Sequence, residues 1–367
     1  MASGKTEYRF LFAGGGTGGH LFPAVAVAEK IKARIPEADI LFVGTKTKIE
    51  GRVVPKLGYK FKSIWIKGFS RTFDIENLLF PIKLGVSLLQ SLLINMSFRP
   101  KVAIGSGGYV SGPAIWGSSV MGAKVILLEQ NSYPGITTRL LEKYADEIHT
   151  SYSDSAKYLK SKDKIKITGN PIRESLTKID RVAALRHFGL SSGIKTLLIL
   201  GGSLGAASIN EAVSLSITLF KEKKIQMIWQ TGNNYYNIYK DRAENGIIIS
   251  PFFEDMNMVY SAADLVVARA GATTIAELLV LGIPSVLIPS PNVAENHQYY
   301  NAKSLADENA AIIIEDKNVR NNLADIIIST IYNDKKLEDL SNNSKKLGKP
   351  DAASRIAESA IRFANVV

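Results

Sequence analysis

Each half of this 367-residue chain begins with the same local pattern: an apolar run, a glycine-rich turn and an amphipathic stretch. The pattern reads FLFAGGGTGGH at residues 10–20 and LLILGGSLGA at residues 197–206. Short apolar runs that alternate with helical stretches are typical of parallel sheets covered by helices. The chain is also long enough to bury two separate cores. We therefore predict an α/β protein of two Rossmann-like domains whose parallel sheets face each other across a cleft.

The expected boundaries follow from where the pattern restarts. We predict an N-terminal domain at residues 1–168, a C-terminal domain at residues 169–348, and a final segment, 349–367, whose helix packs back on the first domain. Pro23 is expected in the first turn of its helix, where a missing N–H is tolerated. The predicted strands are 8–13, 39–43, 102–104, 124–128, 147–150, 196–200, 226–230, 246–250, 265–267, 285–288 and 311–314, and the predicted helices are 23–35, 78–96, 135–143, 208–221 and 352–363.

The composition excludes several kinds of site. The chain has no cysteine, so disulfides and thiolate metal sites are ruled out. The segment from Met1 to Arg9 lacks the apolar core of a signal peptide, and the apolar stretch 84–96 is too short to cross a bilayer.

The net charge is +11, and residues 43–101 hold eleven Lys and Arg against three acids. This excess indicates either an anionic partner or a solvated basic surface.

The first glycine turn contains G-x-G-x-x-G, as Gly14, Gly16 and Gly19. Glycines let a backbone approach phosphate, and the start of the following helix offers free N–H groups. A dinucleotide-binding domain would also need an acid at the end of the second strand. That strand runs into Lys46 without one, which disfavours NAD and leaves an NADP enzyme as an alternative.

Two further glycine turns and one longer block extend this picture. The turns are GSGGYVSGP at residues 105–113 and GGSLG at residues 201–205, and each follows a predicted strand. In residues 268–289 a strand meets a small-residue turn, and a helix begins near Thr273 and carries Glu277. The helix start could neutralise a diphosphate and the carboxylate could accept two ribose hydroxyls, although Glu277 could equally only complement the helix dipole.

Together with EQN at residues 129–131, GNPIR at 169–173 and NHQYYN at 296–301, these motifs make the chain resemble the MurG family over nearly its whole length. That family comprises GT-B glycosyltransferases of peptidoglycan synthesis. The resemblance implies transfer of N-acetylglucosamine from UDP-N-acetylglucosamine to the 4-hydroxyl of undecaprenyl-diphosphate-linked N-acetylmuramyl-pentapeptide (lipid I), with inversion. The chain departs from the family pattern at Leu128 and Thr138, where His and Asn are expected.

The resemblance also implies the roles of individual residues. Glu277 would hold the ribose, the turn from Arg269 to Thr274 the diphosphate, and backbone groups of Phe253 the uracil. The residues expected to bind the donor are Thr17, Gly18, Asn131, Arg173, Ser203, Phe253, Arg269, Ala272, Thr273, Thr274, Glu277, His297 and Gln298. The residues expected to bind the acceptor are Gly15, Gly16, Thr17, Gly19, His20, Gly107, Gly108 and Tyr109.

For catalysis, His20 is the first candidate for the base because the ordinary pKa of histidine lies near working pH. Glu129 is the alternative base, and His20 could instead only bind the acceptor diphosphate. No D-x-D triplet occurs, so we expect no essential metal and no cofactor. Helix N-termini and Arg173 would stabilise the departing UDP.

A lipid acceptor gives the basic segment a function. In residues 69–100 apolar side chains interleave with cations, a pattern suited to peripheral attachment at the cytoplasmic face of the plasma (inner) membrane. The apolar members are Phe73, Ile75, Leu78, Leu79, Phe80, Ile82 and Leu89, and the cations are Arg71, Lys83 and Arg99. The expected partners are UDP-N-acetylglucosamine, lipid I, an anionic membrane surface and other cell-wall synthesis proteins, but not nucleic acid. The alternatives are another GT-B lipid glycosyltransferase, a UDP-sugar epimerase, and an NADP-dependent oxidoreductase.

Overall fold

The computed structural model describes residues 8–68 and 79–366. The N-terminal stretch before Tyr8 and the predicted membrane-contacting residues Arg71, Phe73, Ile75 and Leu78 lie outside this part of the chain. Two compact units divide the chain, and we describe each by itself. Unit 1 is Met1–Arg173 together with Pro350–Val367, and unit 2 is Glu174–Lys349.

Unit 1 is built on a seven-stranded sheet in the order β3-β2-β1-β4-β5-β6-β7. All of its strand pairs are parallel, so the carboxyl ends of the strands share one edge. β1 lies at the centre between β2 and β4, and its apolar residues are fully buried. The strands are β1 (Arg9–Gly14), β2 (Asp39–Gly44), β3 (Lys60–Ser63), β4 (Val102–Gly107), β5 (Lys124–Glu129), β6 (Glu147–Thr150) and β7 (Ile165–Ile167).

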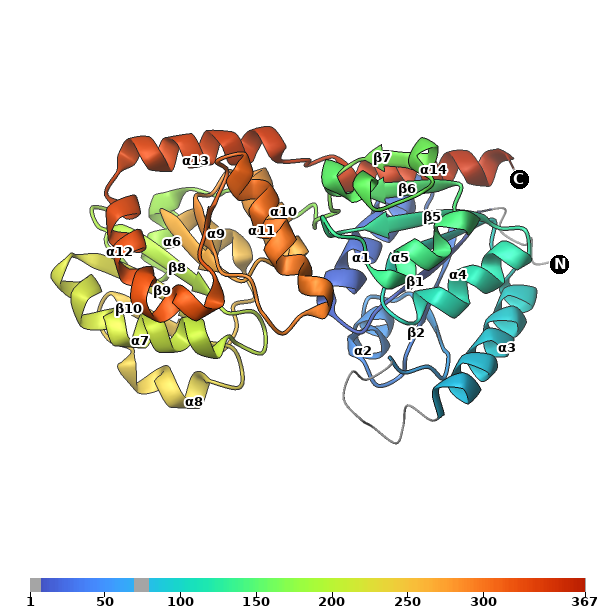
Figure 1. Cartoon of the computed structure of the whole chain (residues 1–367), viewed down its shortest axis with the longest axis horizontal. Helices are drawn as coiled ribbons and strands as arrows, with labels where there is room; N and C mark the ends of the chain where they lie inside the picture. The colour runs from blue at the N-terminus through green and yellow to red at the C-terminus, as the bar shows by residue number, and fades with distance from the viewer. Residues whose placement is uncertain (1–7, 69–78, 367) are drawn as a thin grey trace. The chain divides into compact units, whose positions relative to one another are not determined.

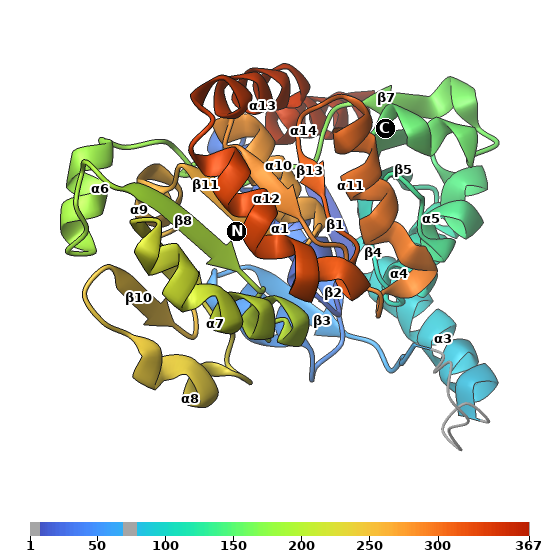
Figure 2. The ribbon, with the colours of Figure 1, turned by 60° about the vertical axis from the view of Figure 1, so that its left-hand side comes forward.

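Alternate residues of these strands pack against different helices, as expected for period-2 side chains. On one face Phe10 and Phe12 join a core with α1 and α14, and on the other Leu11 and Ala13 join a core with α4 and α5. α3 lies outside α4, beside which it runs in both views (Figures 1 and 2). The helices are α1 (Gly18–Arg34), α2 (Ile49–Lys56), α3 (Phe80–Phe98), α4 (Ser111–Val120), α5 (Ile136–Leu141) and α14 (Ala352–Val366).

Unit 2 repeats this design with a six-stranded parallel sheet in the order β10-β9-β8-β11-β12-β13. The central strand β8 is buried, and α7 and α12 pack on one face of the sheet. The strands are β8 (Lys195–Leu200), β9 (Ile225–Gln230), β10 (Ile247–Ser250), β11 (Leu265–Ala268), β12 (Ser285–Leu287) and β13 (Ile312–Ile313). The helices are α6 (Arg181–His187), α7 (Ala207–Glu222), α8 (Tyr236–Tyr239), α9 (Met256–Ala262), α10 (Ala272–Leu281), α11 (His297–Asp307), α12 (Val319–Ile331) and α13 (Asp334–Leu347).

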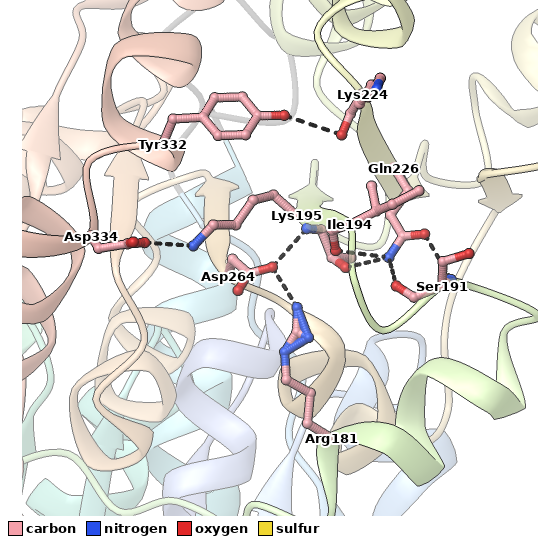
Figure 3. A network of polar contacts seen from close by, with 10 residues as sticks. Arg181, Ser191, Ile194, Lys195, Lys224, Gln226, Asp264, Tyr332 and Asp334 are labelled. Atoms are coloured by element: carbon pink, nitrogen blue, oxygen red, sulfur yellow. Dashed lines mark hydrogen bonds and ion pairs between the residues drawn. The ribbon is translucent and has the colours of Figure 1, made fainter.

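A polar network holds the amino-terminal edge of this second sheet (Figure 3). The Asp264 carboxylate accepts hydrogen bonds from the backbone N–H of Thr196, at 2.7 Å, and from Arg181, at 2.5 Å. The Gln226 side chain bonds both the N–H and the C=O of Ser191, so the loop before β8 is tied to β9. The network lies at the opposite edge of the sheet from the glycine turn after β8.

Two expectations about local structure are wrong. α1 begins at Gly18, so Pro23 lies inside the helix and not in its first turn. The glycine turn itself therefore forms the start of α1. α3 is longer than the predicted apolar stretch, and by length and composition it could cross a membrane. Only 22% of its most apolar window is buried within the protein.

Candidate active site

The first two glycine turns of unit 1 meet because they follow adjacent strands. β1 and β4 pair in parallel, so the turns after Gly14 and Gly107 leave the same edge of the sheet. Gly107 has a φ of +101°, and a Cβ there would lie 2.6 Å from Nδ1 of His20. This position therefore requires glycine, and the second turn packs directly on the histidine at the end of the first.

His20 lies in the first turn of α1 and is partly buried. Its Nδ1 is 3.0 Å from the carbonyl oxygen of Ser106 and 3.3 Å from Oε1 of Gln130. The amide group of Gln130 also donates to the Leu128 carbonyl, which orients Oε1 toward the histidine. Both neighbours of Nδ1 are acceptors, so Nδ1 carries the proton in the neutral ring and Nε2 carries the lone pair. Within the described part of the chain, nothing hydrogen-bonds to Nε2.

The charge state of His20 suits a base. Burial lowers the pKa of His20 below its ordinary value, and the hydrogen bonds to Gln130 and Ser106 and the charge of Glu50 oppose this only in part. The neutral ring therefore predominates near neutral pH. A neutral imidazole with a fixed tautomer and an available lone pair can accept a proton from an alcohol.

Unlike the Nε2 atom of His20, the carboxyl group of Glu129 is already surrounded by hydrogen-bond donors. Oε1 accepts from the backbone N–H of Asn131 at 3.0 Å, and Oε2 accepts from that of Gly135 at 3.0 Å. The Asn131 amide and the Thr138 hydroxyl also bond the carboxyl group, and burial is the main reason that its pKa is raised. Thr138, which departs from the family pattern, thus helps to hold Glu129. These contacts make Glu129 an anchor for the loop from Asn131 to Gly135.

Glu50 was missed as a site residue by the sequence analysis. It lies in the first turn of α2 and is only 1% exposed. Its Oε2 accepts from the backbone N–H of Gly16 at 2.9 Å, and its Oε1 accepts from the N–H and hydroxyl of Thr45. The acid that seemed absent after β2 is therefore present a few residues later, at the start of α2, and it faces the glycine turn. An acid at the start of a short amphipathic stretch after a strand was the available signal.

The corresponding turn in unit 2 leads into α10. Glu277 lies on this helix, is 8% exposed, and accepts a hydrogen bond at 2.7 Å from the hydroxyl of buried Tyr260. The helix N-cap, Gly271, offers no side-chain cap. The hydroxyl of Thr273 is buried and has no hydrogen-bond partner among the described residues. An uncapped helix start beside an unpaired hydroxyl can bind an anion.

Arg269 does not extend its guanidinium group toward that helix start. Its Nη1 pairs with Asp316 at 2.5 Å and donates to the carbonyl oxygens of Ile288 and Pro289. Its Nη2 donates to Ser208 at 3.0 Å. The side chain therefore braces β11 against α7 and the segment after β12, and only the backbone of the turn remains to face a ligand.

The remaining predicted residues of unit 2 surround the same edge. Ser203 is exposed in the turn after β8, and Phe253 donates its backbone N–H to Gln230. His297 begins α11, with Nδ1 at 2.7 Å from the Ala294 carbonyl oxygen, and Gln298 accepts from the N–H of Ser290. In unit 1, Tyr109 is 58% exposed beside Gly68, and Arg173 is exposed at the end of the unit.

Comparison with known proteins identifies the family. The glycosyltransferase family 28 N-terminal domain matches residues 10–150, and the family 28 C-terminal domain matches residues 196–356. A relative from Bacteroides thetaiotaomicron is 43% identical over 98% of this chain and 99% of its own length. One from Flavobacterium psychrophilum is 41% identical over 97% and 98%. Both are named UDP-N-acetylglucosamine–N-acetylmuramyl-(pentapeptide) pyrophosphoryl-undecaprenol N-acetylglucosamine transferase. The chain belongs to this transferase family.

Solved structures agree with this assignment. A crystal structure of Acinetobacter baumannii MurG matches with a TM-score of 0.77 at 26% identity, over 97% of this chain and 99% of that one. A UDP-glucose:anthocyanidin 3-O-glucosyltransferase in complex with UDP matches with a TM-score of 0.72 at 13% identity, which shows the fold alone. The resemblance to the MurG family, the GT-B fold with two parallel sheets, and the N-acetylglucosamine transferase function are thereby confirmed.

Proposed function

We propose that this MurG-family chain transfers N-acetylglucosamine from UDP-N-acetylglucosamine to the 4-hydroxyl of lipid I, with inversion at the sugar. The observation that carries the mechanism is His20: its Nδ1 is fixed between two acceptors, so the lone pair of a neutral ring is on Nε2. In the proposed step Nε2 removes the proton of the acceptor hydroxyl as its oxygen attacks C1 of the sugar. UDP then leaves from the opposite face.

We assign the donor to unit 2. The uncapped start of α10 and the Thr273 hydroxyl would bind the diphosphate, and Glu277, oriented by Tyr260, would accept the ribose hydroxyls. The other proposed contacts of the donor are Thr17, Gly18, Asn131, Arg173, Ser203, the backbone of Phe253 and of the turn from Arg269 to Thr274, His297 and Gln298. Helix amides and Arg173 would stabilise charge on the leaving diphosphate without a metal.

We assign the acceptor to the edge of unit 1. The amides at the start of α1, in Gly18 and Gly19, are the kind that a helix leaves unpaired. Together with Gly15, Gly16, Thr17 and the second turn at Gly107, Gly108 and Tyr109, they would hold the acceptor's diphosphate. His20 then lies at the end of the phosphate-binding turn, within reach of the neighbouring sugar. Glu129 is the weaker choice of base because four donors already surround its carboxyl group.

The reaction is tested by UDP release that depends on a lipid I analogue. We expect release with UDP-N-acetylglucosamine and this acceptor, and none when the acceptor is omitted. Thermal shifts should appear with UDP and UDP-N-acetylglucosamine but not with NADPH. No release with the lipid I analogue, combined with release on another lipid acceptor, would overturn the proposal in favour of a different glycosyltransferase.

We also propose that α3 attaches the enzyme to an anionic membrane surface at the cytoplasmic face. The helix buries its polar residues Lys83, Ser87, Ser91 and Asn95. Some of its apolar side chains, such as Leu84 and Ile94, pack on the core of unit 1, and others face solvent. Asn95 accepts a hydrogen bond from Ser118 of α4 at 2.7 Å, so the inward face is a specific polar contact. The outward side chains, each more than 40% exposed, are Leu79, Ile82, Leu89, Leu93 and Met96.

The cations near this surface are arranged differently from the sequence prediction. Lys83 is only 7% exposed, with its ammonium group over the Trp65 ring, so it does not border the apolar stripe. Lys62 and Arg99 are exposed. Apolar side chains that enter the headgroup region, with cations beside them, favour binding to anionic lipid.

Vesicle co-sedimentation tests this attachment. The double substitution Leu89→Glu with Leu93→Glu should weaken binding to anionic vesicles by about tenfold or more. The matched control is Leu215→Glu, because Leu215 is an equally exposed leucine, at 60%, on α7 of unit 2. Equal vesicle binding by all three proteins, or no binding by the native chain at low salt, would contradict the proposed role of α3.

A further inference from the structure

Glu50 places a negative charge inside the turn that the proposed function assigns to a phosphate. The carboxylate is buried, and its two oxygens accept three hydrogen bonds, from the Gly16 N–H, the Thr45 N–H and the Thr45 hydroxyl. An acceptor-only group with this set of donors is an ionised carboxylate. The Gly16 N–H of the glycine turn is therefore already paired with a protein carboxylate.

The Glu50 side chain is packed closely against Gly15 and Gly44. A Cβ at Gly15 would lie 2.3 Å from the Glu50 carboxyl carbon, and a Cβ at Gly44 would lie 2.4 Å from its Cγ. Gly16 itself has a φ of +84°, a conformation that the bond to Glu50 helps to fix. α2 thus delivers one carboxylate into a space that both glycine positions leave open for it.

We propose that Glu50 is a positioning residue for the acceptor: it occupies the Gly16 end of the turn and confines the acceptor phosphate to the amides at the start of α1. This inference deepens the proposed function and rests on it. The physical reason is repulsion, because a phosphate beside a buried carboxylate would place like charges together. The phosphate is therefore directed toward Gly18 and Gly19, on the side of His20.

The same carboxylate acts on His20 through its charge. Among the contributions to the pKa of His20, the charge of Glu50 raises it, against the larger lowering by burial. Removing that charge should therefore lower the pKa of His20 further. This titration reports the effect of the Glu50 charge on His20 separately from turnover.

The test compares Glu50→Gln with Glu37→Gln, an exposed acid of the same unit, in the full-length protein. In Glu50→Gln the amide N–H₂ group faces either the Gly16 N–H or the Thr45 N–H, so one of these two hydrogen bonds is lost. We expect kcat/KM for the lipid I analogue to fall roughly 10- to 100-fold, since small displacements of reacting groups cost about this much. The donor KM should stay within about twofold, because the residues that Glu50 hydrogen-bonds, Gly16 and Thr45, are not among the proposed donor contacts. Glu37→Gln should match the native enzyme in both values.

A second measurement does not depend on turnover. The chain has four histidines, so the His20 ring can be followed by NMR across pH and assigned with His20→Gln. The pKa of His20 should be lower in Glu50→Gln than in the native protein and Glu37→Gln, and closer to native in Glu50→Asp, which keeps the charge. Glu50→Asp also serves if Glu50→Gln does not fold.

The outcomes separate the two proposals. An unchanged His20 titration together with native acceptor kinetics in Glu50→Gln would overturn the role of Glu50 while leaving the transferase reaction intact. If the native enzyme releases no UDP with lipid I analogues, the proposed reaction fails. The NMR titration then still decides whether Glu50 controls the charge state of His20.

Discussion

The start of α1 in unit 1 and the start of α10 in unit 2 are built from the same elements but are left in different states. Each follows a buried parallel strand and a turn of small residues. In unit 1 the turn already holds a carboxylate, Glu50, bonded to Gly16. Neither α1 nor α10 has a side-chain cap, but in unit 2 the Thr273 hydroxyl is unpaired among the described residues and Arg269 is bonded elsewhere.

The difference indicates how one supersecondary unit can serve two purposes. A helix start without an internal anion can accept the two negative phosphates of a nucleotide. In unit 1 the internal anion takes the Gly16 N–H just before the start of α1. Beside it, Ser106 and Gln130 hold His20 in one tautomer, and burial favours its neutral form. Unit 1 is therefore the better place for proton transfer, and unit 2 for nucleotide binding.

The largest expected effect on catalysis comes from removing the proposed base, His20. His20→Gln should reduce kcat by roughly 10²- to 10⁴-fold at saturating acceptor, the usual contribution of a general base. UDP binding to unit 2, measured by calorimetry, should not change. Near-normal turnover at saturating acceptor would remove His20 from catalysis and leave it as a phosphate ligand only.

The second prediction concerns the opposite unit. Glu277→Ala should raise the donor KM by about 10- to 100-fold, because charged hydrogen bonds to the ribose would be lost. The acceptor KM should be unchanged. Tyr260→Phe removes only the hydroxyl that orients Glu277, so it should change the donor KM in the same direction by less. A rise in the acceptor KM of equal size would contradict the division between the units.

Both candidate residues could be proposed from the sequence. Glu277 and His20 each lie within a few residues of a glycine turn, where the local pattern of strand, turn and helix is strong. Most strands of both sheets were predicted for the same reason, since their apolar runs are continuous. The exact strand ends and the two short edge strands of unit 1, β3 and β7, were not, because hydrogen bonding to a neighbour decides them.

Glu50 and Arg269 were harder because their partners are distant in sequence. Gly16 lies 34 residues from Glu50, and Asp316 lies 47 residues from Arg269. No local period encodes such contacts. The polar inward face of α3 is a similar case, because the hydrogen bond between Asn95 and Ser118 joins two separate helices and no local pattern encodes it.

The third prediction concerns how the reaction rate depends on pH. A base must be neutral to accept a proton, and the pKa of His20 is lowered by burial. The rate should therefore be level above this pKa and fall about tenfold per pH unit below it. The pKa read from the acid side of the kcat/KM profile for the acceptor should be lower than the ordinary histidine pKa of about 6.5. An acid limb above that value would indicate that the lone pair of His20 is not the one titrated.

The smallest expected effect comes from the unpaired hydroxyl at α10. Thr273→Val keeps the shape of the side chain and removes only the group that has no partner among the described residues. If that hydroxyl binds the diphosphate, UDP affinity should fall by roughly three- to tenfold, the value of one hydrogen bond. The protein itself should be no less stable, and should unfold at a slightly higher temperature, because a buried polar group without a partner is costly. Thr330→Val is the matched control, because it removes another buried hydroxyl without a partner among the described residues, on α12 of the same unit. A loss of stability without loss of UDP affinity would mean that the Thr273 hydroxyl serves the fold, and that the start of α10 binds phosphate through its backbone alone.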